Sequence, residues 1–76
     1  MGRSRADTRI LRQFGERVRE RRMGLDLSQE HCAHEAGMHA VYWSGIERGE
    51  RNLSLINIEK ISRAFQISLA ELFRGI

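Results

Sequence analysis

The residues of this sequence that are best suited to binding chemistry are its arginines. Twelve of the thirteen basic residues are Arg, and eight of the twelve lie in residues 1–22, where only three acidic residues accompany them. A guanidinium group can hold phosphate oxygens or a base edge through two parallel hydrogen bonds, which an ammonium group cannot do. Basic charge is therefore concentrated at one end of the chain. This pattern indicates an anionic partner such as nucleic acid, although a solvated arginine-rich helix face would have the same composition.

A second group of candidate chemical residues is Cys32 with the three histidines, His31, His34 and His39. Thiolate and imidazole are common metal ligands, and a cysteine can also act as a redox switch. His31 and His34 share a face of the predicted helix, whereas Cys32 points toward the apolar side. The spacing contains neither C-x-x-C nor H-x-x-x-H. We therefore interpret Cys32 as a small core residue and predict no metal site and no cofactor.

Patterns typical of catalysis do not occur in the sequence. It has no glycine-rich phosphate loop, no plausible Ser-His-Asp arrangement and no carboxylate pair in an apolar setting. A helical domain of 76 residues rarely encloses a substrate pocket, so we predict that the protein is not an enzyme. No apolar run approaches the roughly 20 residues that cross a bilayer, and the first residues lack the apolar region of a signal peptide. We expect no membrane partner and a cytoplasmic location.

The elements that must position these side chains are predicted to be helices. Apolar residues recur at helical spacing along the chain, which contains no proline and no strand-like alternation. The first helix is predicted over about residues 8–23 with Thr8 as its N-cap, and residues 1–7 are expected to form a flexible arm. Three serines are predicted to cap later helices, and glycines to end two of them. The predicted fold is a single compact all-α domain over residues 1–76, with N-caps at Ser28, Ser54 and Ser68 and a third helix over His39–Glu47.

The two C-terminal helices carry apolar residues beyond those that a core needs. The predicted inward stripe of the fourth helix comprises Leu55, Ile58, Ile61, Ser62 and Phe65. Ile56 lies off this stripe, and Leu69 begins the last helix as an outward apolar residue. Exposed apolar groups on so small a domain are typical of a two-fold interface. We therefore predict a homodimer with Ile56 and Leu69 at its interface.

Gly37 separates two short predicted helices at the spacing of a helix-turn-helix unit. Gln29 begins the first helix, Ala33 is small enough to let another helix approach, and Ile46 anchors the second helix in the core. A short glycine turn lets the second helix cross the first steeply, so that its outer face can enter the DNA major groove. Because many helical hairpins contain a turn glycine, the spacing alone leaves a purely structural hairpin open.

The stretch LSQEHCAHEAGMHAVYWSGIERGERNLSLINIEKISRAFQISLAELF resembles the five-helix domain of the XRE family of Cro/C1-type phage repressors. Within it, YWSGIERGERNLSLINIEKI is similar to the controller proteins of restriction–modification systems. The resemblance implies a sequence-specific regulator of transcription that binds double-stranded DNA as a homodimer on a (pseudo)palindromic operator. It leaves open a related alternative, an antitoxin-type interaction module of a toxin–antitoxin pair that also binds DNA. The small size of the chain leaves no room for an effector domain, which favours a controller protein.

The resemblance also assigns roles to individual residues. Gln29 and Tyr42 correspond to residues that contact the sugar-phosphate backbone, and the segment after the recognition helix corresponds to one that grips phosphate. Each could instead have a purely structural or solvated role. Arg22 and Glu47 correspond to an ion pair between the first and third helices. The predicted DNA-contact residues are Gln29, His39, Ala40, Val41, Tyr42, Ser44, Gly45, Arg48, Arg51 and Asn52.

The sequence departs from the controller pattern at the start of the recognition helix. Ala40 and Val41 stand where controller proteins often have Arg-Thr, and Trp43 stands where they have an aliphatic residue. The face expected to be exposed comprises Ala40, Val41, Ser44 and Gly45. It therefore offers one hydroxyl group and no long polar side chain. Two routes to specificity remain, namely contact with thymine methyl groups and readout of DNA shape. Trp43 precedes Ile46 by three residues and is predicted to be buried.

Overall fold

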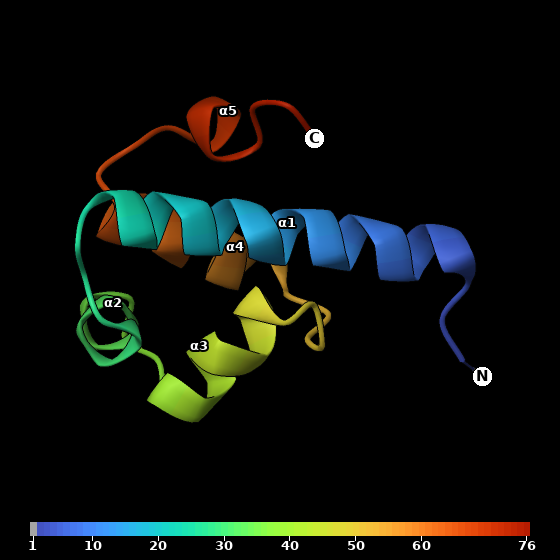
Figure 1. The fold of residues 1–76 in the computed structure, drawn as a ribbon, viewed down its shortest axis with the longest axis horizontal. Coiled ribbons are helices and arrows are strands. Elements are labelled where there is room, and N and C mark those ends of the chain that lie inside the picture. Colours follow the sequence, from blue (N-terminus) through green and yellow to red (C-terminus); the bar gives the residue numbers. More distant parts are fainter. Residues whose placement is uncertain (1) are drawn as a thin grey trace.

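This computed structural model describes residues 2–76. They contain five helices and no strand (Figure 1). The prediction of an all-α fold with five helices is confirmed. None of these helices is both long enough and apolar enough to cross a membrane. The helices are α1 (Arg5–Gly24), α2 (Gln29–Glu35), α3 (Ala40–Glu47), α4 (Leu55–Ala64) and α5 (Leu69–Leu72).

A serine is the N-cap residue of four of the five helices. The predicted caps are confirmed: Ser28, Ser54 and Ser68 each accept a hydrogen bond from the backbone N–H three residues on, at 3.0–3.1 Å. Such bonds satisfy a donor that the first turn of a helix leaves free. Gly37, with φ of +69°, adopts the left-handed conformation expected of a turn glycine after α2.

The predicted start of the first helix was wrong by three residues. α1 begins at Arg5 because Ser4 and Asp7 form a reciprocal capping box, with bonds of 3.1 and 3.2 Å. The Thr8 N–H instead donates to the Ser4 carbonyl oxygen as an ordinary helical residue. Residues 5–7, which were expected to belong to a flexible arm, are therefore helical.

The core draws side chains from all five helices. Val18, Trp43, Ile61 and Leu72 are fully enclosed, and Cys32 is 2% exposed. The burial predicted for Trp43 is confirmed, and its ring meets the Phe65 ring edge-on at 5.8 Å between centroids. The prediction for Leu55 was wrong. Its side chain is 74% exposed because α4 turns the side of Ile58, Ile61 and Phe65 toward the core.

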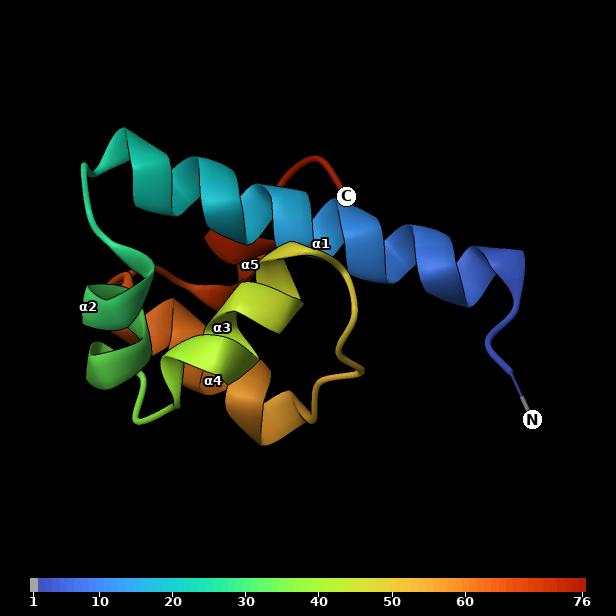
Figure 2. The same cartoon turned by 60° about the horizontal axis from the view of Figure 1, so that its bottom comes forward.

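Two glycines bring the end of α3 against α1, which lies across it (Figure 2). Gly15 lies so close to α3 that a Cβ atom there would stand 2.4 Å from the Ile46 carbonyl oxygen. Gly49, just after α3, has φ of +75°, and a Cβ atom there would lie 2.9 Å from the Arg12 Cα atom. Only glycine fits both sites without a backbone shift. α1 therefore supports the C-terminal end of α3 and leaves the N-terminal turn of α3 free.

Candidate nucleic-acid interface

The first turn of α3 is the exposed part of the helix-turn-helix unit. Val41 is 74% exposed, and His39, the N-cap residue, is exposed as well. The opposite face of α3 is buried through Trp43 and Ile46. Because α3 is anchored at its other end, its free tip presents an apolar surface of Val41 and the half-buried Ala40.

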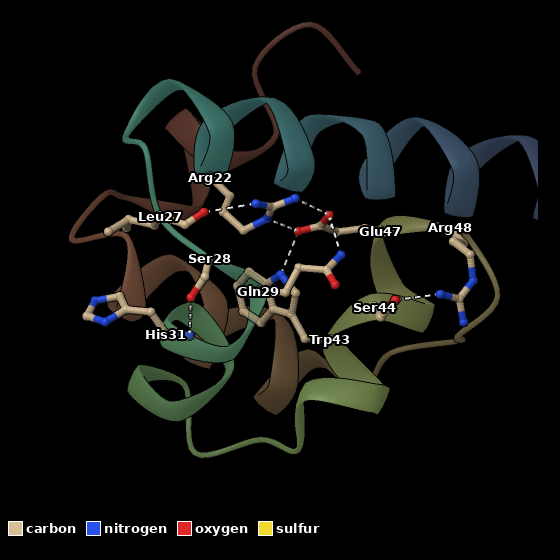
Figure 3. A network of polar contacts seen from close by, with 9 residues as sticks. All are labelled: Arg22, Leu27, Ser28, Gln29, His31, Trp43, Ser44, Glu47 and Arg48. Atoms are coloured by element: carbon tan, nitrogen blue, oxygen red, sulfur yellow. Dashed lines mark hydrogen bonds and ion pairs between the residues drawn. The ribbon is translucent and has the colours of Figure 1, made fainter.

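The hydroxyl group of Ser44 is already engaged by Arg48 (Figure 3). The Arg48 side chain donates from Nη1 to Ser44 Oγ, and from Nε and Nη2 to the Glu50 carboxylate at 3.1 Å each. The hydrogen bonds to Arg48 lower the pKa of Glu50 and raise that of Arg48. Both side chains are more than half exposed, so this ion pair is weak and solvent-screened. A DNA phosphate could therefore replace Glu50 as the partner of Arg48.

Arg51 is exposed, and its side chain folds back over α3. Its guanidinium carbon lies 5.4 Å from the centre of the Tyr42 ring, within the range of a cation–π contact. The Tyr42 hydroxyl oxygen in turn accepts a hydrogen bond of 3.1 Å from Asn57 Nδ2. The expectation that Gly45 is exposed was wrong: Gly45 is buried, and a Cβ atom there would lie 3.1–3.2 Å from the Arg51 side chain. Asn52, the next residue, is exposed.

A buried carboxylate holds α1, α2 and α3 together. Glu47 receives hydrogen bonds from Arg22 Nε at 2.7 Å and Nη2 at 3.0 Å, which form a two-pronged ion pair. It also receives bonds from Gln29 Nε2 at 2.9 Å and Trp43 Nε1 at 2.6 Å. Arg22 Nη1 donates onward to the Leu27 carbonyl oxygen. The ion pair implied by the resemblance is thus present, within a larger network (Figure 3).

The ionisation of Glu47 depends on these donors. Burial by itself would raise the pKa of this carboxyl group, because it disfavours the charged form. The hydrogen bonds from Arg22, Gln29 and Trp43 favour the charged form and outweigh burial, so the pKa of Glu47 lies below its ordinary value. The group is therefore a carboxylate at neutral pH and fixes the orientation of α3.

Gln29 has a structural contact that the sequence did not reveal. One N–H of its amide group points inward to Glu47, while the side chain stays partly exposed at the N-terminus of α2. A primary amide carries two N–H donors and a carbonyl oxygen, so the second N–H is available to a phosphate. The bond to Glu47 would then orient Gln29 for that contact.

Exposed apolar side chains occur at the start of each of the last two helices. Leu55 and Ile56, in the first turn of α4, are 74% and 68% exposed, and Leu69, the first residue of α5, is 36% exposed. The outward position expected of Ile56 is therefore observed. Burial of such side chains against another molecule would be favourable, because each removes apolar area from water.

The cysteine and histidine side chains do not converge. Among residues 2–76, no three His, Cys, Asp or Glu side chains are grouped to hold a metal ion. Burial raises the pKa of the Cys32 thiol, which keeps it protonated and makes it a poor nucleophile. The His31 ring lies 3.9 Å from the Glu35 carboxylate at the surface. Cys32 is thus a core residue, as its position on the apolar side of the helix predicted.

The predicted DNA-contact residues gather on α3, the loop after it and the start of α2. Two partners of these residues were missed. Glu50, two residues after Arg48, is an acidic residue close enough in sequence to have been considered as its counter-charge. Asn57, which bonds Tyr42, lies fifteen residues away and gave no local signal.

Comparison with known proteins relates the whole helix-turn-helix unit to one family. A family model described as helix-turn-helix matches residues 18–72. Control protein C.MunI of Mycoplasma sp is 45% identical over 64 residues, which cover 83% of this chain and 86% of that protein.

Two solved structures share the fold. The restriction–modification controller protein C.AhdI from Aeromonas hydrophila superposes with a TM-score of 0.80 and 48% identity, covering 83% of this chain and 96% of that chain. The P22 c2 repressor, in complex with a synthetic operator, superposes with a TM-score of 0.73 and 33% identity, covering 83% of this chain and 96% of its own.

Proposed function

Because the chain belongs to the XRE-type helix-turn-helix family, we propose that it is a restriction–modification controller protein. In this proposal it regulates transcription in the cytoplasm by binding double-stranded DNA at a specific operator. It acts as a homodimer, and the operator is correspondingly (pseudo)palindromic, since two-fold protein symmetry matches two half-sites.

The observation that carries the proposal is the setting of α3. The Glu47 network and the glycine contacts with α1 hold its C-terminal end, while its first turn is exposed. Arg51 packs against Tyr42 in the first turn of α3, and the weakly paired Arg48 bonds Ser44 one turn further along, so positive charge lies along this side of α3. A fixed helix tip with basic residues beside it is suited to a DNA groove bordered by phosphates. The likeness to controller proteins and to an operator-bound repressor supports this function.

Selection of duplexes from a random pool would test the proposal directly. We expect the protein to enrich a two-fold symmetric sequence and to bind it roughly 1,000-fold or more tightly than random DNA at physiological salt. Equal binding to all duplexes would contradict sequence-specific regulation. Stable co-purification with a toxin partner, without sequence preference on DNA, would favour the antitoxin alternative.

The Arg51 side chain is expected to contact a phosphate. Arg51→Ala should weaken binding to selected and random duplexes by a similar factor. It should also lower the slope of log affinity against log salt by about one per protomer, because one fewer counterion is released. Fluorescence anisotropy over a range of salt concentrations measures both effects.

Two variants control for the packing of Arg51 against Tyr42. Arg51→Lys keeps the charge and should keep the salt slope, while Arg63→Ala removes an exposed arginine from α4 and should also leave it unchanged. If Arg51→Ala retained the slope but lost discrimination at one base pair, Arg51 would be a base-reading residue instead.

The apolar tip of α3 is expected to read thymine methyl groups. Replacing thymine by uracil removes the methyl group and keeps every hydrogen-bonding group of the base. In the selected operator, uracil at one or two positions of each half-site should cost on the order of 1 kcal/mol per contacted methyl.

Val41→Ala should make binding indifferent to at least one of these replacements, because the Val41 side chain is the apolar group most exposed on the tip. Competition binding with each uracil-substituted duplex measures the change. If no uracil position in the whole operator alters affinity, the tip reads no methyl group and specificity rests on DNA shape.

A further inference from the structure

The arginines of α1 fall into two sets that differ in their partners. Arg17 and Arg21 lie 3.8 and 3.9 Å from the Glu71 carboxylate of α5, and Arg22 pairs with Glu47. Arg5, Arg9, Arg12 and Arg19 are exposed, and within residues 2–76 none of them forms an ion pair. We refer to Arg5, Arg9 and Arg12 as the arginine stripe. The paired arginines stabilise the fold, whereas the stripe has no such role in the isolated chain.

The spacing of the arginine stripe places three positive charges on one side of α1. Residues four and seven positions apart lie along the same helix face, and like charges at this spacing destabilise an isolated helix. The stripe borders a shallow hollow on α1 whose lining is Arg3, Arg5, Thr8, Arg9, Arg12, Gln13 and Glu16. Four arginines face one carboxylate there, so the surface keeps a net positive charge. Asp7, also in the first turn of α1, is engaged in the capping box with Ser4.

The arginine stripe adjoins the loop that follows α3. The Cα atom of Arg12 is packed against Gly49, and Asn52 shares a second hollow with Arg3, Asp7, Ile10 and Leu11. α5, whose Glu71 pairs with the other arginines, lies on the opposite side of α1 from α3 (Figure 1). The first turns of α1 also project beyond the rest of the fold (Figures 1 and 2). The stripe therefore meets this loop through Arg12, which packs beside Gly49, a residue between Arg48 and Arg51 in the sequence.

We propose that the arginine stripe is a second phosphate-binding surface, which contacts the DNA backbone next to the phosphates held by residues 48–52. This inference rests on the proposed function. A duplex backbone fits the stripe because it offers anions at regular intervals along a rigid rod, while α1 offers cations at regular intervals along a rigid helix. A second copy of this chain is a poorer partner for the stripe, because it would bring a surface of the same positive charge. The stripe lies before residue 18, where the match to the family model begins, so that match does not account for it.

The test compares two double variants with the same change of charge. Arg5→Gln/Arg9→Gln removes two charges from the stripe, and Lys60→Gln/Arg63→Gln removes two from α4, beside the turn after α2. Glutamine has a helix propensity close to that of arginine and lysine, so both helices should persist. The probes are a duplex selected by the wild-type protein from a random pool and a random duplex of the same length.

The stripe variant is expected to lower the slope of log affinity against log salt by about two per protomer, since each phosphate that is no longer neutralised lowers it by about 0.9. The α4 variant should keep the wild-type slope. The ratio of specific to random affinity should stay unchanged in the stripe variant, because phosphate contacts carry no base information. In ethylation interference, some phosphates are expected to weaken binding of the wild-type protein when they are ethylated. Ethylation of the phosphates that the stripe contacts should no longer weaken binding of the stripe variant. Arg5→Lys/Arg9→Lys, which keeps the charge, should retain the wild-type slope.

The outcomes separate this inference from the function on which it rests. A slope for the stripe variant equal to that of the α4 variant would overturn the stripe contact and leave the operator-binding proposal standing. A reduced specificity ratio at unchanged slope would also overturn it, since the stripe would then act on base recognition. Failure of the wild-type protein to prefer any duplex would overturn both.

Discussion

Glu47→Gln is expected to lower the free energy of unfolding by about 3 kcal/mol, the scale on which breaking a buried ion pair destabilises a protein. The total free energy of unfolding of a domain of this size is roughly 5–10 kcal/mol, so this loss is a large fraction of it. Urea unfolding followed by far-UV circular dichroism and by the fluorescence of Trp43, the single tryptophan, measures it.

The expected loss follows from what glutamine cannot do at this site. The carboxylate accepts four hydrogen bonds, two from Arg22 and one each from Gln29 and Trp43. A glutamine amide has one oxygen and one NH2 group, so its donor would meet the N–H donors of Arg22 or Trp43. The guanidinium of Arg22, only 14% exposed, would also be left without its counter-charge.

A matched control is available at the surface. Glu50→Gln makes the same chemical change in another carboxylate that pairs with an arginine, but Glu50 and Arg48 are more than half exposed. Its unfolding midpoint should equal that of the wild type. The double variant Arg22→Met/Glu47→Gln should be less destabilised than the sum of its single changes, because no unpaired charge remains. Equal midpoints for Glu47→Gln and Glu50→Gln would contradict a stabilising role for the network.

The same carboxylate predicts how stability depends on pH. The folded state holds the pKa of Glu47 below its ordinary value, whereas in the unfolded chain it is about 4.3. The stabilisation is therefore fully present above the unfolded pKa and is lost as pH falls through the lower folded pKa. The difference in the free energy of unfolding between the wild type and Glu47→Gln should be constant near neutral pH. It should shrink toward zero in strong acid, where Glu47 is protonated. A difference that persists unchanged at low pH would mean that the charge is not its cause.

The fold was predictable from the sequence because its signals are local. Ser28, Ser54 and Ser68 each bond a backbone N–H three residues on, so a serine before an apolar period predicts a helix start wherever nothing competes. At the first helix the predicted cap, Thr8, was wrong, because an earlier pair of residues caps the helix. Ser4 and Asp7 together satisfy two backbone N–H groups, whereas Thr8 could offer only one bond, and the capping box extends the helix.

The positions that were mispredicted depend on contacts between distant or flexible groups. The Arg51 side chain, which folds back onto Tyr42, helps to cover Gly45. Leu55 and Ile56 are adjacent apolar residues in the first turn of α4, and both proved exposed, so helical periodicity misplaced Leu55. Arg48 was considered for phosphate alone, although it also forms a weak ion pair with Glu50, two residues later, in the free protein. The sequence thus predicted a set of candidate DNA-contact residues, while the pairing of their charges required the structure.

Ile56→Glu is expected to convert a homodimer into a monomer and to weaken operator binding by roughly 100-fold or more. Two linked half-site contacts bind far more tightly than one, and this gain disappears when the protomers separate. Leu55 and Ile56 are 74% and 68% exposed, the largest outward apolar side chains of α4. A carboxylate at position 56 would have to lose its hydration on entering an apolar interface, which is costly without a partner. Sedimentation equilibrium measures the oligomeric state, and anisotropy with the selected duplex measures affinity.

The charge change itself is controlled by Gln66→Glu, which adds the same negative charge at an exposed position beyond the end of α4. This variant should remain dimeric and bind the operator nearly as the wild type does. A dimer would also place two α3 helices about 34 Å apart, one DNA turn, so inserting half a helical turn between the half-sites should weaken wild-type binding as strongly as Ile56→Glu. The monomeric variant should be insensitive to that insertion, because each of its half-sites is bound independently. Two results would contradict the homodimer: wild-type protein that sediments as a monomer at tens of micromolar, or an operator that tolerates the insertion. Leu55 and Ile56 would then not lie at a dimer interface.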